Sequence, residues 1–327
     1  MHRYEGGDVL RALGVSCRGR ESFVRQDSRI CVDCAKDKGG RALPIFLEAR
    51  LPKTLERVEL LPLSDVHCGD ANFKAEAFDA LLKWVLAEPQ RYVFLNGDLI
   101  DAATRHSVGD VYNAQMNPQS EKKWIIEKLK PLAKDCGEEI TLTTHKGGHR
   151  QEYKTTGRLL GVTTGNHEFR LWKDSGADPS EDIALALDIP YCAEGCIVAL
   201  YVGRADAGKG KRHDQAPVGY TVYITHGAGG GRRPGAKANR LEDLSLQVEG
   251  IDVAIVGHTH QTLTMANEVL VPDIHNKRVM VRDRVYVNSG SFLAWGGYAQ
   301  TKGMTPGGHR MPVVELSGRT KEIRVHS

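Results

Sequence analysis

The stretch YVFLNGDLID, residues 92–101, is a short apolar run that ends directly in Asn96, Gly97 and the carboxylates Asp98 and Asp101. Runs of four to eight apolar, β-forming residues are typical of strands that are buried on both faces. In open α/β sheets, ligand sites gather at the carboxyl ends of such strands. The stretch therefore predicts a buried strand that delivers functional carboxylates.

The same arrangement recurs along the chain, which becomes α/β in pattern from about residue 55. Helical patterns at residues 73–86 and 124–132 lie between the runs, and residues 278–287 and 311–325 are predicted as further strands. The five apolar runs, each with the polar residues that follow it, are 58–63 with Ser64 and Asp65, 92–95 with Asn96 and Asp98, 159–164 with Asn166 and His167, 220–225 with His226, and 253–256 with His258.

The side chains at these five strand ends are metal-ligand types. Carboxylate, imidazole and amide oxygen suit Mn, Fe or Zn. A D-x-H pair at a strand end grips one ion, and a lone carboxylate can bridge two. One D-x-H motif alone is weak support, but five elements that each end a strand in ligand-type residues together predict a metal site. The candidate ligands are Asp65, His67, Asp98, Asn166, His226, His258 and His260.

This motif set, spread over roughly residues 58–291, resembles the calcineurin-like metallophosphoesterase superfamily. The resemblance implies an α/β fold of four layers, a β-sandwich flanked by helices. It implies a first ion held by Asp65, His67, Asp98 and His260, and a second held by Asp98, Asn166, His226 and His258. It also implies that His167 is the general acid. Asp101 would orient His167, or instead cap or line a loop.

The resemblance further implies a hydrolase that cleaves phosphoester bonds by attack of a metal-bridging hydroxide. Two ions ~3.5–4 Å apart clamp a phosphate and acidify the water between them. Manganese is the favoured metal, with Fe, Zn or Ni as alternatives. An imidazolium can protonate the leaving oxygen near neutral pH. A non-catalytic binding module would lack ligands, and none is missing.

The leading hypothesis for the substrate is a phosphodiester of a nucleic acid, DNA or RNA, or of a nucleotide. The alternative is a phosphomonoesterase that acts on a phosphoprotein or a small phosphate ester. The long spacing between Asp98 and Asn166 and a late GSF…GGY segment also resemble uncharacterised phage or prophage proteins. That resemblance supports a nucleic-acid setting by association only.

Candidate substrate-binding residues are basic. Residues 203–240 carry eight Lys or Arg residues against two Asp residues. Within this stretch Arg232 and Arg233 follow His226 through a glycine run, which favours a phosphate-facing rim over a solvated loop. Arg170 would hold substrate phosphate or form a surface salt bridge. Trp295 and Tyr298 are interpreted as packing residues rather than as a base-stacking pair.

Residues 1–50 are predicted to be a small appendage, and residues 55–327 the metallophosphoesterase domain. Cys17, Cys31 and Cys34 resemble a zinc ribbon whose fourth ligand position holds Arg20. Decay of an ancestral ribbon is favoured over a structural zinc ion. Residues 103–158 are interpreted as an insertion, either a surface excursion or a lid over the site.

Bulk properties exclude few function classes. The chain has 327 residues and a net charge of +3, so it shows no overall polyanion-binding signature. It contains no apolar run near the ~20 residues of a membrane span and no secretory h-region at its beginning. A cytoplasmic location is therefore expected, in which the seven cysteines are thiols or metal ligands. No association with a membrane is predicted, and the sequence leaves protein partners open.

Overall fold

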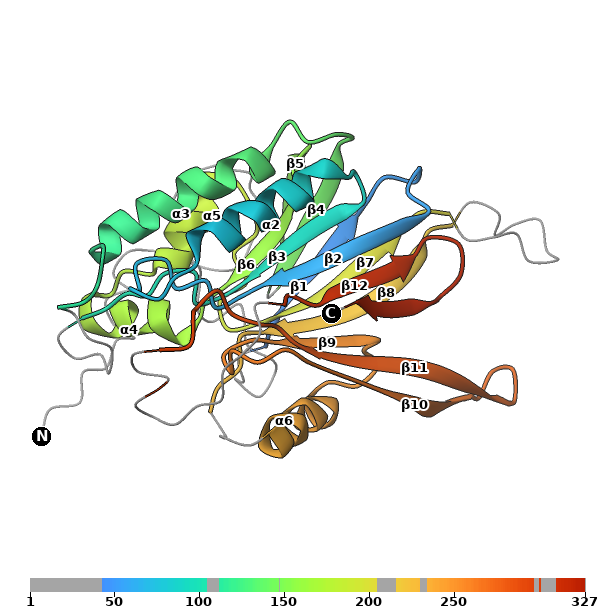
Figure 1. Cartoon of the computed structure of the whole chain (residues 1–327). Helices are drawn as coiled ribbons and strands as arrows, with labels where there is room; N and C mark the ends of the chain where they lie inside the picture. Colours follow the sequence, from blue (N-terminus) through green and yellow to red (C-terminus); the bar gives the residue numbers. More distant parts are fainter. Residues whose placement is uncertain are drawn as a thin grey trace, which may run out of the picture.

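The computed structural model describes residues 43–104, 112–146, 148–204, 216–229, 234–296, 300 and 310–326. Two β-sheets pack face to face, and helices cover the outer face of each (Figure 1). The order of layers is helices, five-stranded sheet, eight-stranded sheet, helix. The structure therefore confirms the predicted fold class, an α/β sandwich of four layers.

The five-stranded sheet contains three of the five apolar runs and the predicted strand region 311–325. Its order is β13-β12-β2-β3-β6, with β2, β3 and β6 parallel and β12 antiparallel to β2. Every residue of β6 is buried, because helices cover one face of this sheet and the other sheet covers the second face. Its strands are β2 (Arg57–Leu63), β3 (Arg91–Asn96), β6 (Leu159–Thr163), β12 (Val313–Ser317) and β13 (Ile323–His326).

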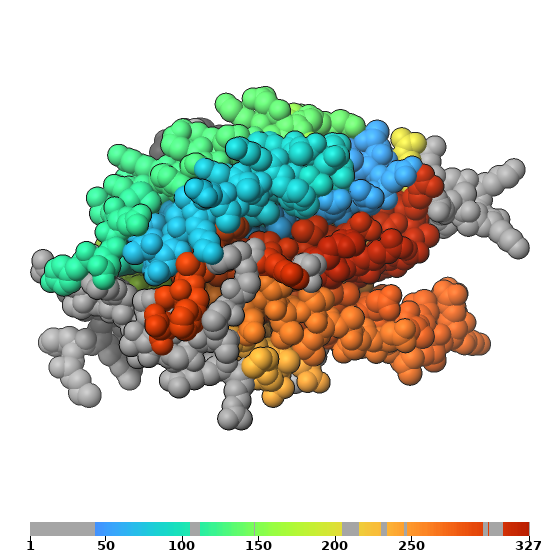
Figure 2. Space-filling model, viewed as in Figure 1, coloured from blue at the N-terminus to red at the C-terminus, as the bar shows by residue number. Residues whose placement is uncertain are grey.

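The eight-stranded sheet is mixed, in the order β10-β11-β9-β8-β7-β1-β4-β5. Its strands are β1 (Ile45–Arg50), β4 (Ile140–Lys146), β5 (His149–Thr155), β7 (Cys196–Val202), β8 (Val218–Thr225), β9 (Val253–Val256), β10 (Leu263–Asp273) and β11 (Arg278–Asn288). β8, β9 and β11 are parallel neighbours. The β10–β11 hairpin, orange in Figure 2, forms a narrow arm beneath β12 and β13.

The helices close the sandwich from both sides. α2 (Ala75–Ala87), α3 (Pro118–Ala133) and α5 (Pro179–Leu187) bury apolar faces against the five-stranded sheet. α6 (Pro234–Gln247) packs Leu241 and Leu244 against the outer face of the larger sheet. α4 (Asn166–Ser175) directly follows β6. In the described part of the chain, no helix is both long and apolar enough to cross a membrane.

The structure corrects the sequence analysis at residues 45–50, which it assigned to the appendage. They form β1, an interior strand of the larger sheet, paired with β4 on one side and β7 on the other. Ile45, Leu47 and Ala49 point into the core between the sheets. The strand was missed because its partners lie about 90 and 150 residues further along the chain, so nothing local marks it as central. Residues 1–42, with all three candidate zinc ligands, lie outside the described residues.

The described part of the predicted insertion is packed into the fold. Ile125, Leu129 and Leu132 of α3 are buried with the helices on the five-stranded sheet. β4 and β5 form an antiparallel hairpin that extends the larger sheet beyond β1. α3 and β4 are therefore parts of the core layers, and β5 is an exposed edge strand of the larger sheet, so neither a lid nor a surface excursion describes α3 and β4.

Two truncations should behave differently. Removal of residues 1–42 should leave the folded domain intact, whereas removal of residues 1–50 deletes β1 and breaks the pairing of both β4 and β7. We expect the protein without residues 1–50 to be insoluble, or to be unfolded as measured by circular dichroism. As matched point variants, Leu47→Ala should cost ~2–5 kcal/mol of unfolding free energy, and Phe46→Ala, at an exposed position of the same strand, much less. A folded protein without residues 1–50 would contradict the assignment of β1 to the core.

Candidate metal centre

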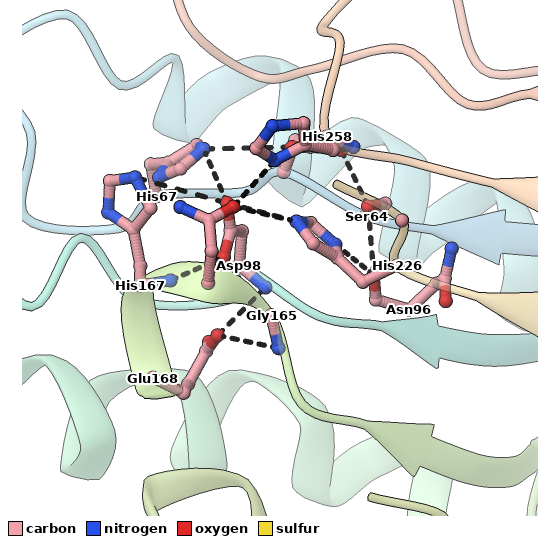
Figure 3. A network of polar contacts seen from close by, with 12 residues as sticks. Ser64, His67, Asn96, Asp98, Gly165, His167, Glu168, His226 and His258 are labelled. Atoms are coloured by element: carbon pink, nitrogen blue, oxygen red, sulfur yellow. Dashed lines mark hydrogen bonds and ion pairs between the residues drawn. The ribbon is translucent and has the colours of Figure 1, made fainter. Parts of the chain in front are cut away.

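The predicted ligand side chains meet at one edge of the two sheets, where five strands end (Figure 3). The strands reach this edge through short turns, so residues far apart in sequence come together. Asp65 and His67 follow β2, Asp98 and Asp101 follow β3, Asn166 and His167 begin α4 after β6, His226 follows β8, and His258 and His260 follow β9.

One cluster consists of Asp65, His67, Asp98 and His260, whose ligand atoms all lie within 4.8 Å of one another. His67 Nε2 lies 3.1 Å from His260 Nε2 and 3.7 Å from Asp98 Oδ2. His260 Nε2 lies 3.2 Å from Asp65 Oδ1. Zinc-nitrogen and zinc-oxygen bonds of ~2.0–2.2 Å require ligand atoms about 3–3.7 Å apart, so these donors can converge on one ion.

A second cluster contains Asp98, His226 and His258. His226 Nε2 lies 3.2 Å from Asp98 Oδ2 and 3.2 Å from Asn166 Oδ1. His258 Nδ1 lies 2.6 Å from the same Asn166 oxygen. The amide oxygen thus completes a set of four donors. Asp98 Oδ2 faces His67 in the first cluster and His226 in the second, so one carboxylate is shared.

The first cluster also contains a buried oxygen that fits a cation. Asp65 Oδ1 is fully buried and has no hydrogen-bond partner in the described part of the chain, although His260 Nε2 is 3.2 Å away. The other oxygen, Oδ2, accepts from Ser64 Oγ at 2.6 Å and from the His258 backbone N–H at 2.9 Å. A buried carboxylate oxygen without a donor is costly unless a cation meets it. The donor set therefore fits two divalent ions.

The backbone turns sharply at most of these ligands. Asp65, His67, Asp98, His258 and His260 have φ between 48° and 68°, the left-handed region that non-glycine residues rarely occupy. Such conformations cost of order 1–3 kcal/mol each and persist where surrounding contacts impose them. The strain lets each turn direct its side chain toward the shared centre.

Two glycines allow the β3 and β6 turns to approach each other. A Cβ atom on Gly97 would lie 2.6 Å from the backbone nitrogen of Gly165, and one on Gly165 would lie 2.1 Å from Asp98 Oδ1. Both distances are far below van der Waals contact. The position of Asp98 therefore depends on both residues lacking a side chain.

Charges at the centre shift the pKa values of its groups strongly. Burial raises the pKa of the Asp98 carboxyl, but His226 and His167 outweigh burial and hold that pKa well below its usual range. Burial lowers the pKa of His226, and Asp98 raises it to a net value of about 10. Burial lowers the pKa of His67. Without ions, a proton on His226 thus compensates Asp98, and a bound cation would replace that proton.

A hydrogen bond at ring nitrogen Nδ1 orients His226. Its Nδ1 lies 2.7 Å from the carbonyl oxygen of Asn96, to which it can donate, and this turns Nε2 toward Asp98. Fixing a histidine through its second nitrogen is common at metal sites. The Asn96 side chain in turn donates to the carbonyl of Thr225 at 3.0 Å, which ties the β3 and β8 ends together.

His167 stands beside the two clusters at the start of α4. Its backbone N–H donates to Asp98 Oδ1 at 2.8 Å. Its ring Nδ1 lies 2.6 Å from the backbone carbonyl oxygen of Asp101 and 3.3 Å from the Asp101 carboxylate. Burial lowers the pKa of His167, while Asp98 and Asp101 raise it to a net value of about 9. Without ions the ring would therefore carry a proton at neutral pH, and its Nε2 lies 3.9 Å from Asp98 Oδ2.

Sequence analysis missed Glu168, which is fully buried beneath the centre. Its carboxylate accepts four backbone N–H groups, from Leu99 at 2.7 Å and Ile100 at 3.2 Å, and from Asp98 at 2.9 Å and Gly165 at 3.1 Å (Figure 3). Burial first, and Asp98 second, raise its pKa to about 7. The signal in the sequence was a glutamate at the third position of a helix, the pattern of a capping box.

A second buried carboxylate holds the other end of the same loop. Glu121, in the first turn of α3, accepts the backbone N–H of Ala102 at 2.8 Å. Burial raises its pKa to about 8. It comes from the predicted insertion, and no local motif connects it with Asp101 or Asp98. The contact joins the inserted helix to the loop that carries both carboxylates.

The structure describes Arg170 but not the other two predicted substrate-binding residues. Arg170 is half-buried on α4, close enough for its charge to lower the pKa values of Asp101 and His167. Arg232, Arg233 and Tyr298 lie outside the described residues. Ser291, in the late GSF…GGY segment, donates to the backbone carbonyl of Asp65 at 3.0 Å, so this segment supports the turn that carries Asp65.

One family of known proteins matches most of the chain. A family model described as calcineurin-like phosphoesterase matches residues 60–262. A conserved uncharacterised protein from Streptococcus pneumoniae TIGR4, described as a predicted phosphoesterase, has a TM-score of 0.33 and 12% identity over 83% of this chain and 90% of its own. A protein of unknown function from Aquifex aeolicus has a TM-score of 0.30 and 13% identity over 62% of this chain and 80% of its own. Scores this low carry no argument, and no curated protein matches the chain.

Replacement of Glu168 should weaken metal binding although this residue contacts no ion. In Glu168→Gln, the amide NH₂ would face backbone N–H donors, so the Asp98 turn should loosen. We expect metal affinity to fall ~10–100-fold, the usual effect of losing a group that supports a ligand. Titration with a competing chelator measures it, and Glu127→Gln, at an exposed position of α3, is the matched control. Unchanged metal affinity in a folded Glu168→Gln protein would refute the positioning role.

Proposed function

The chain belongs to the calcineurin-like phosphoesterase family and is a metal-dependent phosphoesterase, and we propose that it cleaves phosphodiesters of nucleic acids or nucleotides at a centre of two manganese ions. The observation that carries the proposal is the shared carboxylate of Asp98, which lies in both ligand clusters. A carboxylate shared in this way supports two ions side by side, the arrangement suited to in-line displacement at phosphorus.

In this proposal the protein supplies two complete ligand sets. Asp65, His67, Asp98 and His260 would hold the first ion, and Asp98, Asn166, His226 and His258 the second. When bound, the ions would polarise the phosphoryl oxygens and lower the pKa of water to near neutrality. The bound ions would displace protons from the ligand atoms, so the carboxylates would be ionised and the imidazoles neutral.

His167 would donate the proton that the leaving oxygen needs. Its Nδ1 is occupied by the Asp101 carbonyl, so Nε2, 3.9 Å from Asp98 Oδ2, is the nitrogen that faces the site. Cations at the clusters would offset the part of the raised pKa that comes from Asp98. The contacts of Nδ1 with Asp101 would hold the ring in this orientation, which is the role proposed for Asp101. The Asp101 carboxylate would also stabilise the protonated form of the ring.

A diester of nucleic acid or nucleotide is favoured over a monoester by the charges around the centre. Arg170 lies near enough to His167 and Asp101 for its charge to act on both, and the ligand His226 lies within the basic stretch of residues 203–240. Positive charge next to the scissile group would bind neighbouring phosphates of a polyanion. Arg232 and Arg233 are proposed members of this rim. A phosphomonoesterase remains the alternative, because the ion ligands suit either ester.

Activity assays with manganese test the proposal directly. We expect turnover of bis-p-nitrophenyl phosphate and single- or double-stranded DNA to exceed that of p-nitrophenyl phosphate. Asp98→Asn should abolish turnover and lower bound metal, because it weakens the shared ligand of both ions. Metal content by mass spectrometry accompanies the kinetics, and Asp79→Asn, a surface carboxylate of α2, is the control. Full activity and metal in Asp98→Asn would exclude the shared-ligand assignment; faster monoester turnover in wild type would favour the alternative.

The general-acid role of His167 predicts dependence on the leaving group. His167→Ala should retain metal and slow turnover ~10²–10⁴-fold for an alkyl leaving group. The loss should be much smaller for p-nitrophenolate, which leaves without a proton. Rate constants for a series of diesters with leaving groups of increasing pKa measure this difference. A uniform loss across the series would show that His167 has another role.

A further inference from the structure

Two aromatic side chains are stacked on the outer side of α4, next to the metal centre. The rings of Phe169 and Trp172 have centroids 5.3 Å apart and planes that differ by 9°. Phe169 is 38% exposed and Trp172 is 49% exposed. Large apolar side chains normally lower the free energy by burial, so a parallel pair kept in solvent indicates a surface that a ligand can use.

The helix places this pair close to the proposed ion ligands. Phe169 is three residues after Asn166 and two after His167. With 3.6 residues per turn and a 1.5 Å rise, the side chains of Asn166, Phe169 and Lys173 project within about 60° of one another, and Trp172 projects about 60° beyond Phe169 and about 120° from Asn166. Phe169 lies ~4.5 Å and Trp172 ~9 Å along the axis from Asn166. Glu168 and Leu171 face the interior instead. The aromatic pair therefore begins one helical turn from the centre.

Positive charge accompanies the rings. Lys173 Nζ lies 4.8 Å from the centroid of the Phe169 ring, within cation–π range. Arg170, on the next position of the helix, projects about 100° from Phe169, and its charge acts on His167 and Asp101. A flat aromatic surface with a lysine beside it, on a helix that also carries an arginine near the centre, matches a nucleotide, which combines a flat base with an anionic phosphate.

We propose that Phe169 and Trp172 form a stacking platform for a nucleobase of the substrate, next to the phosphate held at the metal centre. This inference rests on the proposed function and narrows its substrate class to phosphodiesters that carry an unpaired base. Bases within a duplex are already stacked, so the platform selects single-stranded nucleic acid or a nucleotide. It recognises the base by its face and is tolerant of sequence.

A protein partner fits the same surface less well. The two exposed ring faces amount to on the order of 200 Å². A stable protein interface buries ~1,200–2,000 Å² in total, so two rings and their flanking charges are too small a surface to define one. A base and its phosphate match both the size and the charge of the platform.

Binding of oligonucleotides tests the platform separately from catalysis. With a chelator present, so that no strand is cut, wild type should bind a single-stranded oligonucleotide more tightly than an abasic strand with the same phosphates. Phe169→Leu/Trp172→Leu keeps apolar side chains and removes the flat rings. We expect it to lose roughly 5- to 150-fold in affinity for the strand with bases, the equivalent of ~1–3 kcal/mol per stacked base, and nothing for the abasic strand.

A conservative variant provides the matched control. Phe169→Tyr/Trp172→Phe keeps two flat rings and should retain most of the preference for the strand with bases. The melting temperature of each variant shows that it is folded. Equal affinity of wild type for the two strands, or an unchanged preference in the leucine variant, would overturn the platform. A change of oligomeric state in the leucine variant, by light scattering, would overturn it in favour of a protein contact.

A pair of small diesters separates this inference from the proposed function. Thymidine 5′-(p-nitrophenyl phosphate) and methyl p-nitrophenyl phosphate share a leaving group and differ in the nucleoside. The leucine variant should raise KM for the nucleoside ester and leave the methyl ester unchanged. If wild type cleaves both esters equally well and shows no preference for bases, the platform fails and the phosphodiesterase stands. If wild type cleaves no diester with any metal, the proposed function fails, and the strand-binding result still decides the platform.

Discussion

The four backbone N–H groups that converge on the Glu168 carboxylate are the constraint on which the metal centre depends. They fix the turn from Asp98 to Ile100 and also the turn at Gly165, so the ends of β3 and β6 are held by one buried side chain. Asp98 can then face His67 on one side and His226 on the other. Because Glu168 is itself in the first turn of α4, the helix that supplies Asn166 and His167 cannot shift without moving Asp98.

This arrangement concentrates negative charge in the interior. Asp65, Asp98, Glu168 and Glu121 are all buried around the centre. Burial first, and neighbouring carboxylates second, raise the pKa of Glu168 to about 7 and that of Glu121 to about 8. Hydrogen bonds to backbone N–H groups stabilise the loop, while like charges and left-handed backbone conformations oppose it. Two divalent cations would relieve the repulsion. Metal binding would thus stabilise the fold as well as provide the chemistry, in proportion to its affinity.

Much of the fold and of the ligand set could be predicted from the sequence, because the residue patterns that indicate them are local. Each of the five apolar runs carries its polar residues at its own end, so the strands and the set of side chains that meet at the sheet edge follow from short stretches. β1, β4 and Glu121 could not be found in this way. β1 is recognisable as central only through β4 and β7, and β4 continues into the exposed, largely polar β5, which lacks an apolar pattern. Glu121 reaches the Asp101 loop through tertiary packing of α3.

A hollow in the surface need not mark a functional centre. One hollow in the described part of the chain lies where β2 and β3 begin, and it is lined by residues of both charges, among them Arg57, Glu88 and Arg319. The ligand clusters lie at the other ends of these strands, so the type of donor atom identifies the centre and concavity does not. Side chains beside the ions would then select the substrate, and α4 is the element whose successive residues combine a proposed ligand, a proposed proton donor, a buried anchor and an exposed aromatic pair.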